Sequence, residues 1–349
     1  MRKRLDTKLR FALTTILGVA LILGIQLEAL HAETTLFQRC QKKTFAKLGK
    51  ISKPNKPMRI GVVLVTLSNP FWVSMKDGFE QAAKDFGAKI DIIQAAPQEN
   101  SVTAQLDILE NMVAKGYDAI VAFTITDQNL IPGLAKANKK GIVVITDKRV
   151  DMKAAREAGA NPIYLGLVDY YAQGKIGAKY IAKKLKKEGG GKVAIIEGLP
   201  GAPQSEARRD GARDVFNADQ SLKLVSVQPG NWDRMTAYNI TTNLLQANPD
   251  LKGIICANDI MALAAVEAIE AAGKKGRVTV VGIDLIPEAK EAIAKGQLAG
   301  SVAFSPFVIG ELCTRTAVAA VMGKKIPKDL YVASVLATKS NINLLYDWK

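Results

Sequence analysis

The sequence predicts an α/β protein made of two doubly wound parallel-sheet domains, and three observations predict it. Short β-branched runs alternate with longer segments of helical periodicity from residue 58 onward. The same order of strands and helices occurs twice along the chain. About 315 residues follow an N-terminal targeting segment, which is enough chain for two domains.

Ten apolar runs are typical of buried strands. They are RIGVVLV, AKIDII, YDAIVAF, GIVVIT, NPIYLGLV, KVAIIE, LKLVSV, KGIICA, RVTVVGI and LAGSVAF. Segments with helical periodicity separate them, such as PFWVSMKDGFEQAAKDF and SVTAQLDILENMVAKG. Apolar strands separated by amphipathic helices indicate parallel sheets that are covered on both faces.

The internal repeat divides the chain into two similar halves, which begin near Met58 and Lys192. In doubly wound sheets, ligands bind beyond the carboxyl ends of the strands, so two facing units would surround one ligand. The alternative is a tandem of independent dinucleotide-binding domains. Neither first turn supports it, because VTLSNPF contains no glycine and EGLPGAP has neither GxGxxG spacing nor the Lys-Ser/Thr of a P-loop.

The N-terminus predicts export. A basic stretch, MRKRLDTKLR, precedes an apolar run from Phe11 to Leu27, and EALHA follows it. We interpret residues 1–32 as a signal peptide cleaved after Ala32, which places the mature protein in the periplasm. The alternative is an uncleaved membrane anchor, since the run is almost long enough to span a bilayer. Residues 33–57 are expected to form a loosely ordered leader.

Charge and composition exclude several function classes. The whole chain has a formal charge of +15, and the mature chain keeps 43 Lys/Arg against 31 Asp/Glu. The lysines are scattered in pairs over the predicted helices, so we expect no nucleic-acid partner. The single histidine, His31, lies in the signal peptide, and Cys40, Cys256 and Cys313 form no CxxC motif. We therefore expect no metal, no cofactor and no His-dependent catalysis, and we expect Cys256 and Cys313 to be core residues.

Polar and aromatic residues gather where the predicted strands end. They are Ser68 to Trp72, Thr146 to Arg149, Ser205 to Arg208, Asn231 to Asp233, Asn258-Asp259 and Ile283-Asp284. Carboxylates and amides bind several hydroxyl groups at once, and aromatic faces cover the C–H faces of a sugar. The combination indicates a site for a polyhydroxylated ligand. Each residue also has a structural interpretation: the asparagines and aspartates as caps, and Phe71 and Trp72 as core.

At these residues the chain resembles the periplasmic sugar-binding proteins of ABC transporters, of the ribose- and allose-binding type. The most specific stretches are LSNPFWVSMKDG, SEARRDGARDVF, VQPGNWDRMTA, CANDIMALAAVEAIEAAGK and VVGIDLIPEAKEAIAKGQLAG. The resemblance implies a sugar or polyol ligand, with contacts carried over to Asn69, Phe71, Trp72, Asp147, Lys148, Arg208, Trp232, Asn258 and Asp284.

Two departures from the ribose-binding pattern alter the expected pocket. Ala122 stands where the family has asparagine, and Phe304 stands where it has glutamine. A ring replaces hydrogen-bonding groups, so Phe304 joins the expected ligand-binding residues. The pocket is expected to take a deoxy or otherwise less hydroxylated relative of the family's aldoses.

The resemblance also implies a type I fold with a three-crossing hinge, near Val168–Asp169, Phe304–Ser305 and Ala333–Ser334. The N-terminal lobe would combine residues 58–168 with 305–333. The C-terminal lobe would combine residues 169–304 with 334–349. The implied function is solute capture by a monomer that delivers its ligand to an ABC permease in the inner membrane, with a chemoreceptor as a further partner.

Three other function classes compete with uptake. The first is a sensor of the same fold that acts in signalling or chemotaxis. The second is a ligand-sensing repressor, which needs a DNA-binding motif before residue 58, where this chain has the signal peptide. The third is an enzyme such as a glycosidase that uses Asp147 and Asp284. We expect Lys148 and Arg208 to keep both carboxylates ionised, whereas a general acid needs a raised pKa.

Overall fold

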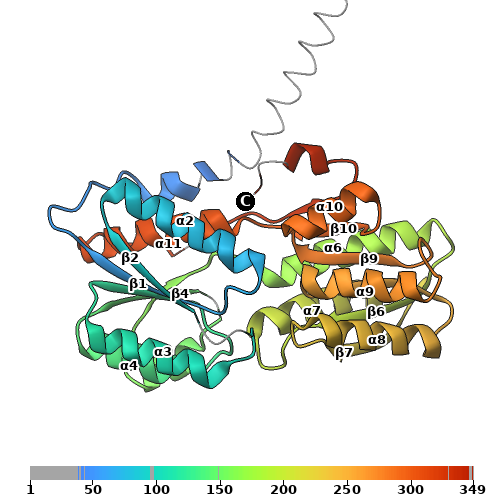
Figure 1. The fold of residues 1–349 in the computed structure, drawn as a ribbon, viewed down its shortest axis with the longest axis horizontal. Helices are drawn as coiled ribbons and strands as arrows, with labels where there is room; N and C mark the ends of the chain where they lie inside the picture. The colour runs from blue at the N-terminus through green and yellow to red at the C-terminus, as the bar shows by residue number, and fades with distance from the viewer. Residues whose placement is uncertain are drawn as a thin grey trace, which may run out of the picture.

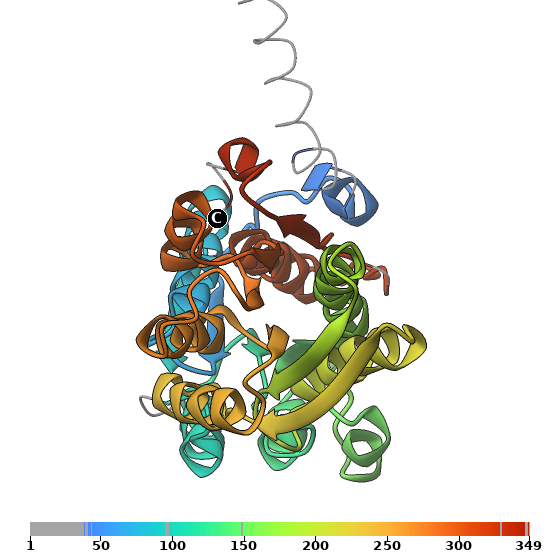
Figure 2. The same cartoon turned by 90° about the vertical axis from the view of Figure 1, so that its right-hand side faces the viewer.

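A computed structural model describes residue 38, residues 41–42, 44–94, 98–147, 149–328 and 330–345, and residue 348. It contains two separate β-sheets, each with helices on both faces (Figures 1 and 2). All ten predicted strands are present, so the α/β fold class with two parallel sheets is confirmed.

The first sheet has the order β2-β1-β3-β4-β5 and is parallel throughout. Its strands are β1 (Arg59–Leu64), β2 (Lys89–Gln94), β3 (Ala119–Ala122), β4 (Val143–Asp147) and β5 (Ile163–Leu165). One face is covered by α2 (Pro70–Phe86) and α11 (Pro306–Val321). The other face is covered by α3 (Val102–Lys115), α4 (Ile131–Lys139) and α5 (Met152–Glu157).

The second sheet has the order β11-β10-β9-β8-β6-β7. Its strands are β6 (Gly191–Glu197), β7 (Leu222–Pro229), β8 (Leu251–Cys256), β9 (Thr279–Asp284), β10 (Gly300–Ala303) and β11 (Val335–Ala337). Helices α6 (Tyr170–Lys186) and α7 (Pro203–Ala218) cover one face. Helices α8 (Arg234–Ala247), α9 (Asp259–Ala271) and α10 (Pro287–Lys295) cover the other face.

The strand order confirms the internal repeat. Counted from the start of each half, strands two, one, three, four and five lie side by side in both sheets. The second sheet adds β11, which pairs with β10 in antiparallel orientation and was not predicted. Its three residues are too few to show a pattern in the sequence.

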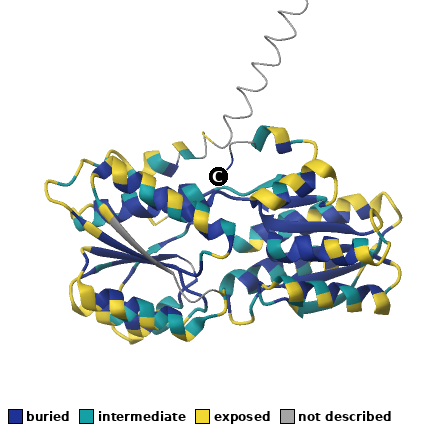
Figure 3. Ribbon diagram, in the orientation of Figure 1, coloured by how far each residue is buried: buried dark blue, intermediate teal, exposed yellow. Residues whose placement is uncertain are grey.

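The strands form the core of both halves, since most of their residues are buried while exposed residues lie on the outer sides of the helices (Figure 3). Close helix contacts lock this arrangement. A Cβ on Gly78 of α2 would lie 2.0 Å from the carbonyl oxygen of Phe307, so α2 and α11 touch through their backbones. Glycine is therefore required where these helices cross. Within the described ranges, no helix has the length and apolar composition needed to span a membrane.

The leader differs from the prediction of loose order. Its described residues Thr44–Leu48 are helical, and the Thr44 hydroxyl donates to the carbonyl of Tyr331 at 2.6 Å. The Arg315 guanidinium lies 5.1 Å from the ring centre of Phe45. Long-range contacts of this kind order a segment whose polar composition alone does not indicate a fixed structure. The signal peptide and Cys40 lie outside the described residues.

Candidate ligand-binding site

The carboxyl ends of the strands from both sheets enclose one cavity of about 40 Å³. Its walls come from the ends of β4 and β9, from the loops and helix starts that follow the strands β1 to β10, and from α11. They are Asn69, Phe71, Trp72, Met75, Glu99, Phe123, Asp147, Arg149, Leu167, Val168, Tyr170, Gln204, Arg208, Trp232, Asn258, Asp284, Phe304 and Ile309. Nine of the ten predicted site residues are in this set. The tenth, Lys148, lies outside the described residues.

Asn69 caps α2, as one interpretation of its position predicted, and it also lines the cavity. Its Oδ1 accepts from the backbone N–H of Phe71 at 2.9 Å, which caps α2. Its Nδ2 donates to Oε1 of Glu99 at 2.6 Å. Trp72 is a second hydrogen-bond partner of Glu99. Burial of the Glu99 carboxyl raises its pKa, and the bonds from Asn69 and Trp72 partly offset that rise.

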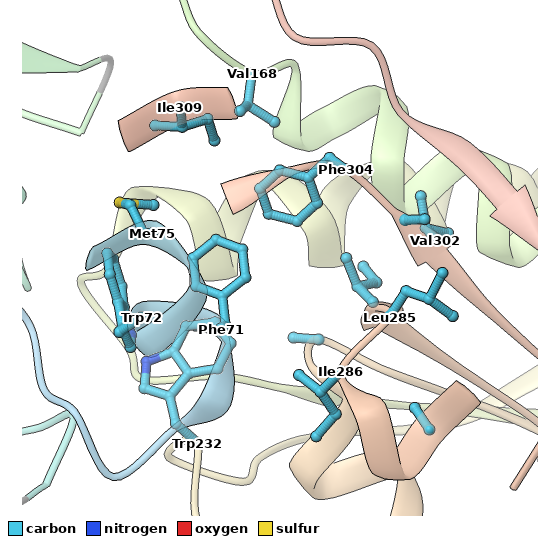
Figure 4. Packing of buried hydrophobic residues seen from close by; sticks show 14 of the residues in the cluster. Phe71, Trp72, Met75, Val168, Trp232, Leu285, Ile286, Val302, Phe304 and Ile309 are labelled. Atoms are coloured by element: carbon cyan, nitrogen blue, oxygen red, sulfur yellow. The ribbon is translucent and has the colours of Figure 1, made fainter. Parts of the chain in front are cut away.

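Six aromatic side chains line the cavity, and Figure 4 labels Phe71, Trp72, Trp232 and Phe304 among them. Phe71 contacts Trp72 edge to face with ring centres 5.1 Å apart, and it contacts Phe304 at the same distance. Trp232 approaches from the second half of the chain, and its ring lies below Phe71 in the view of Figure 4. The sequence left open whether Phe71 or Trp72 fills the core, and both rings are buried and also line the cavity.

Asp147 lies at the end of β4 in a buried ion pair with Arg149. The Arg149 Nε donates to both carboxylate oxygens, at 2.9 and 3.1 Å. Tyr170, at the start of α6, donates its hydroxyl to Asp147 at 3.2 Å. Burial, followed by the negative charge of Asp147, raises the pKa of the Tyr170 hydroxyl, so Tyr170 remains a donor at neutral pH.

Arg208 and Asp284 form the corresponding pair in the second half. The Arg208 Nη2 lies 3.5 Å from Asp284 Oδ1, and both side chains are almost completely buried. Arg208 also donates to Gln173 Oε1 at 2.9 Å and to the carbonyl of Ala257 at 2.7 Å. The guanidinium is therefore fixed by three neighbours, which leaves its direction toward the cavity well defined.

Asn258 caps α9 and also presents its amide to the cavity. Its Oδ1 accepts from the N–H of Met261 at 2.9 Å. Its Nδ2 is buried and, among the described residues, has no hydrogen-bond partner. A buried donor without a partner costs free energy, so this atom is suited to a ligand oxygen.

The loop after β7 shows where a capping interpretation was wrong. Asn231 has a φ of 54° and Trp232 a φ of 62°, both in the left-handed region, and Asp233 caps α8 instead. The turn directs the Trp232 ring against Gly198, where any Cβ would lie 2.2 Å from the ring. Glycine at 198 is therefore needed to admit the indole.

The charge of Arg208 acts on Asp284 in the expected direction, but burial has the larger effect. Burial raises the pKa of Asp284 and Arg208 lowers it, and the net shift places it well above its usual value. The negative charge of Asp259 adds to the increase. A raised pKa on Asp284 therefore removes one of the objections to a carboxylate-dependent enzyme.

Ala122, one of the two departures from the ribose-binding pattern, does not line the cavity. Ala122 packs with Leu109 and Met112 in the cluster between the first sheet and its helices α3 and α4. The next residue, Phe123, lines the cavity instead, and Arg149 lies 5.2 Å from its ring centre. Successive strand residues face opposite sides, so a shift of one residue exchanges a core position for a site position.

Sequence reasoning missed several residues of the wall. The polar ones among the described residues are Glu99, Arg149, Tyr170 and Gln204. Arg149 belongs to the strand-end group Thr146 to Arg149 of the sequence analysis, but it was not among the predicted ligand contacts. Glu99 lies on the loop after β2 and Tyr170 begins α6 after β5, and the sequence pattern does not reveal the paths of these two connections.

The two described cysteines are core residues, as predicted. Cys256 and Cys313 are buried with free thiols, and burial raises the pKa of both. Across the described ranges, no group of three or more His, Cys, Asp or Glu side chains could hold a metal ion.

Comparison with known proteins places the chain. Residues 60–325 match the model of the periplasmic binding protein domain. The chain belongs to the periplasmic binding protein family. Within this family it is 44% identical over 270 residues to the D-allose-binding periplasmic protein of Escherichia coli, covering 77% of this chain and 86% of that protein. It is 34% identical to the ribose import binding protein of Bacillus subtilis, covering 81% and 88% of the two chains.

Solved structures of periplasmic binding proteins share the fold. A solute-binding protein of Actinobacillus succinogenes with bound D-allose superposes with a TM-score of 0.77 at 36% identity, covering 82% of this chain and 99% of that chain. One from Agrobacterium vitis with bound D-fucose superposes with a TM-score of 0.75 at 28% identity, covering 82% and 97%. The predicted resemblance to the ribose- and allose-binding type is confirmed.

Proposed function

We propose that this periplasmic binding protein is the solute-binding component of an ABC sugar importer and that it captures one small sugar in the cavity between its two sheets. The observation that carries the proposal is the meeting of two buried Asp–Arg pairs and six aromatic side chains around one cavity. Relatives named for D-allose and ribose binding support a sugar as the ligand class.

The polar groups suit neighbouring hydroxyls. The carboxylates of Asp147 and Asp284 accept hydrogen bonds, and Arg149, Arg208 and the Nδ2 of Asn258 donate them. Each Asp–Arg pair offers an acceptor and a donor side by side, which matches a hydroxyl that both donates and accepts. Aromatic faces on both sides cover the C–H faces of the ring and exclude water.

Phe304 favours a ligand with fewer hydroxyls than the family's aldoses. It lies between Phe71 and Arg208, with ring centres 5.1 Å apart on one side and the guanidinium 5.6 Å away on the other. An apolar wall at this place offers no partner to a hydroxyl. D-fucose, a deoxy hexose, is bound by the Agrobacterium vitis relative, and ligands of this kind are our preferred class.

Capture requires the walls to move. Most of the side chains that line the cavity are buried, so a sugar reaches them only when the walls move apart. We infer a hinge at Val168–Asp169, Phe304–Ser305 and Ala333–Ser334, with lobes of residues 58–168 plus 305–333 and 169–304 plus 334–349. The packing of α11 on α2 supports this division. The closed protein, a monomer in the periplasm, would dock on the permease.

Uptake is favoured over the other classes. The curated relatives carry names for import, which supports delivery to a permease rather than signalling alone. For an enzyme, the raised pKa of Asp284 would suit a general acid, but both oxygens of Asp147 are occupied by Arg149. A carboxylate paired with a guanidinium is a poor nucleophile and base but can still accept a hydrogen bond from a hydroxyl, so we propose binding without turnover.

A thermal-shift screen tests the proposal. Residues 33–349 are mixed with pentoses, hexoses, deoxy sugars and polyols, and the unfolding temperature is measured. A ligand at 100 times its dissociation constant adds about 2.7 kcal/mol to the free energy of unfolding. Bound sugars are then incubated with the protein and examined for products. The absence of any stabilising sugar would refute the ligand class, and product formation would refute binding without turnover.

A further inference from the structure

A buried carboxylate lies behind the site without lining it. Asp259, the first residue of α9, is 0% exposed. Its Oδ1 accepts from the hydroxyl of Ser301 on β10 at 2.7 Å, and its Oδ2 accepts from the backbone N–H of Ile286 at 3.0 Å. The Ser301 hydroxyl oxygen in turn accepts from the N–H of Leu285 at 3.0 Å. Asp259 and Ser301 thus bind two consecutive amides of the turn after β9.

That turn has an unfavourable backbone conformation. Asp284 has a φ of 123° and Leu285 a φ of 59°, values that L-residues other than glycine rarely adopt. Such conformations persist where surrounding contacts impose them, and they concentrate at functional sites. Here the imposing contacts are the hydrogen bonds of Asp259 and Ser301, and the residue presented by the turn is Asp284.

The sheet leaves room for the carboxylate at one position. A Cβ on Gly282 would lie 2.1 Å from Asp259 Oδ1, so the carboxylate rests against the backbone of β9. Gly282 pairs with Ser301 across the two strands. The pocket for the Asp259 carboxylate is therefore shaped by a glycine and a serine that face each other on adjacent strands.

Charged neighbours of Asp259 are few among the described residues. Arg208 of α7 acts on it from a distance, Asp284 of β9 repels it, and Cys256 of β8 is a buried neutral thiol. The charge of Asp259 is balanced by hydrogen bonds and by the N-terminus of α9 rather than by a direct ion pair. Burial raises its pKa to about 6.

We propose that Asp259, acting through Ser301 and the turn at 284–286, is a positioning residue that fixes the carboxylate of Asp284 against Arg208 and the ligand cavity. The effect on sugar affinity rests on the proposed function, whereas the effect on the backbone of the turn can be measured without any ligand. The alternative is that Asp259 only stabilises the fold.

The test compares Asp259→Asn and Ser301→Ala with a control, Thr241→Ala. Asparagine has one acceptor oxygen, so Asp259→Asn loses one of its two hydrogen bonds, either that from the Ser301 hydroxyl or that from the Ile286 amide of the turn. Ser301→Ala keeps the charge of Asp259 and removes the link to Leu285, which provides a second variant if the first does not fold. Thr241 is buried in α8 and bonds only within its helix, so its loss lowers stability without touching the turn.

Hydrogen exchange in the absence of sugar measures the turn directly. We expect the amides of Leu285 and Ile286 to exchange at least tenfold faster in both variants than in the control. Equal exchange in the variants and the control would overturn the proposal, whatever the ligand proves to be.

Calorimetry with the sugar found by thermal shift measures the consequence. At pH 7, we expect at least a tenfold loss of affinity in both variants and less than a twofold loss in the control.

In wild-type protein we expect the affinity for the sugar to fall on acidification, because Asp284 is then protonated. Because Asp259 raises the pKa of Asp284, the midpoint should move to lower pH in Asp259→Asn. Unchanged affinity and an unchanged pH profile would show that Asp259 only stabilises the fold, and this would overturn the proposal. Failure of every sugar to bind wild-type protein would instead refute the proposed function.

Discussion

Replacing Asp284 by asparagine should abolish most ligand affinity while leaving the fold intact. Asparagine has nearly the same shape and tolerates a positive φ better than most residues, so the turn is preserved. The substitution removes the charge from a group that is 7% exposed and paired with Arg208 at 3.5 Å. A hydrogen bond to a charged group contributes about 1.5–3 kcal/mol, so affinity should fall about 10- to 150-fold.

The stability of the ligand-free protein should change much less. Loss of a buried ion-pair partner is destabilising, but Arg208 keeps its bonds to Gln173 and Ala257. The neutral amide also removes the burial cost and the repulsion from Asp259 that raise the pKa of Asp284. These effects oppose each other, and we expect the free energy of unfolding to change by less than about 1 kcal/mol.

Isothermal titration calorimetry and urea unfolding separate the two quantities. The matched control is Glu288→Gln, which alters an exposed carboxylate paired with Arg234 at 3.0 Å in the same half of the protein. Its affinity should equal that of wild type, because exposed ion pairs contribute little. Wild-type affinity in Asp284→Asn, with the fold intact, would show that Asp284 does not contact the ligand.

Four further predictions concern specificity, core packing, pH and motion. Phe304→Gln should shift preference about tenfold toward fully hydroxylated aldoses in competition binding, because the amide supplies partners that the ring lacks. Ala122→Asn should lower stability by about 1–3 kcal/mol without changing the ranking, since Ala122 is in the core, and a changed ranking would place it in the site. The pKa of Asp259 is about 6 in the folded protein against 3.8 in the unfolded chain, so the folded state binds more protons between these values. Stability from this group should therefore be present below pH 4 and fall by about 3 kcal/mol as the pH rises to 6 and above. Urea unfolding of Asp259→Asn should lack this decrease, and identical slopes in the two proteins would contradict the assignment. Small-angle scattering should show a smaller radius of gyration when ligand is added, and no change at saturation would contradict hinge closure.

The sequence by itself determined the alternation of strands and helices, because buried strands and amphipathic helices impose different spacings on apolar residues. It also determined which residues stand at the strand ends. Asn69 before Pro70, Asp147 after GIVVIT and Asp284 after VVGI are local features, and parallel strands of one sheet bring such ends to the same edge. Nine predicted site residues therefore line one cavity.

Only the tertiary structure decided which neighbouring residue faces the ligand and which contacts fix it. Ala122 and Phe123 are adjacent in the sequence, but the pleat of β3 directs the first to the core and the second to the cavity. Glu99 meets Asn69 across thirty positions, and Asp259 meets Ser301 across forty-two. Such partners come together only when separate strands pair, and the low dielectric of the resulting interior then sets the pKa of Asp284. Burial and long-range pairing are properties of the packed chain, so no local pattern could predict them.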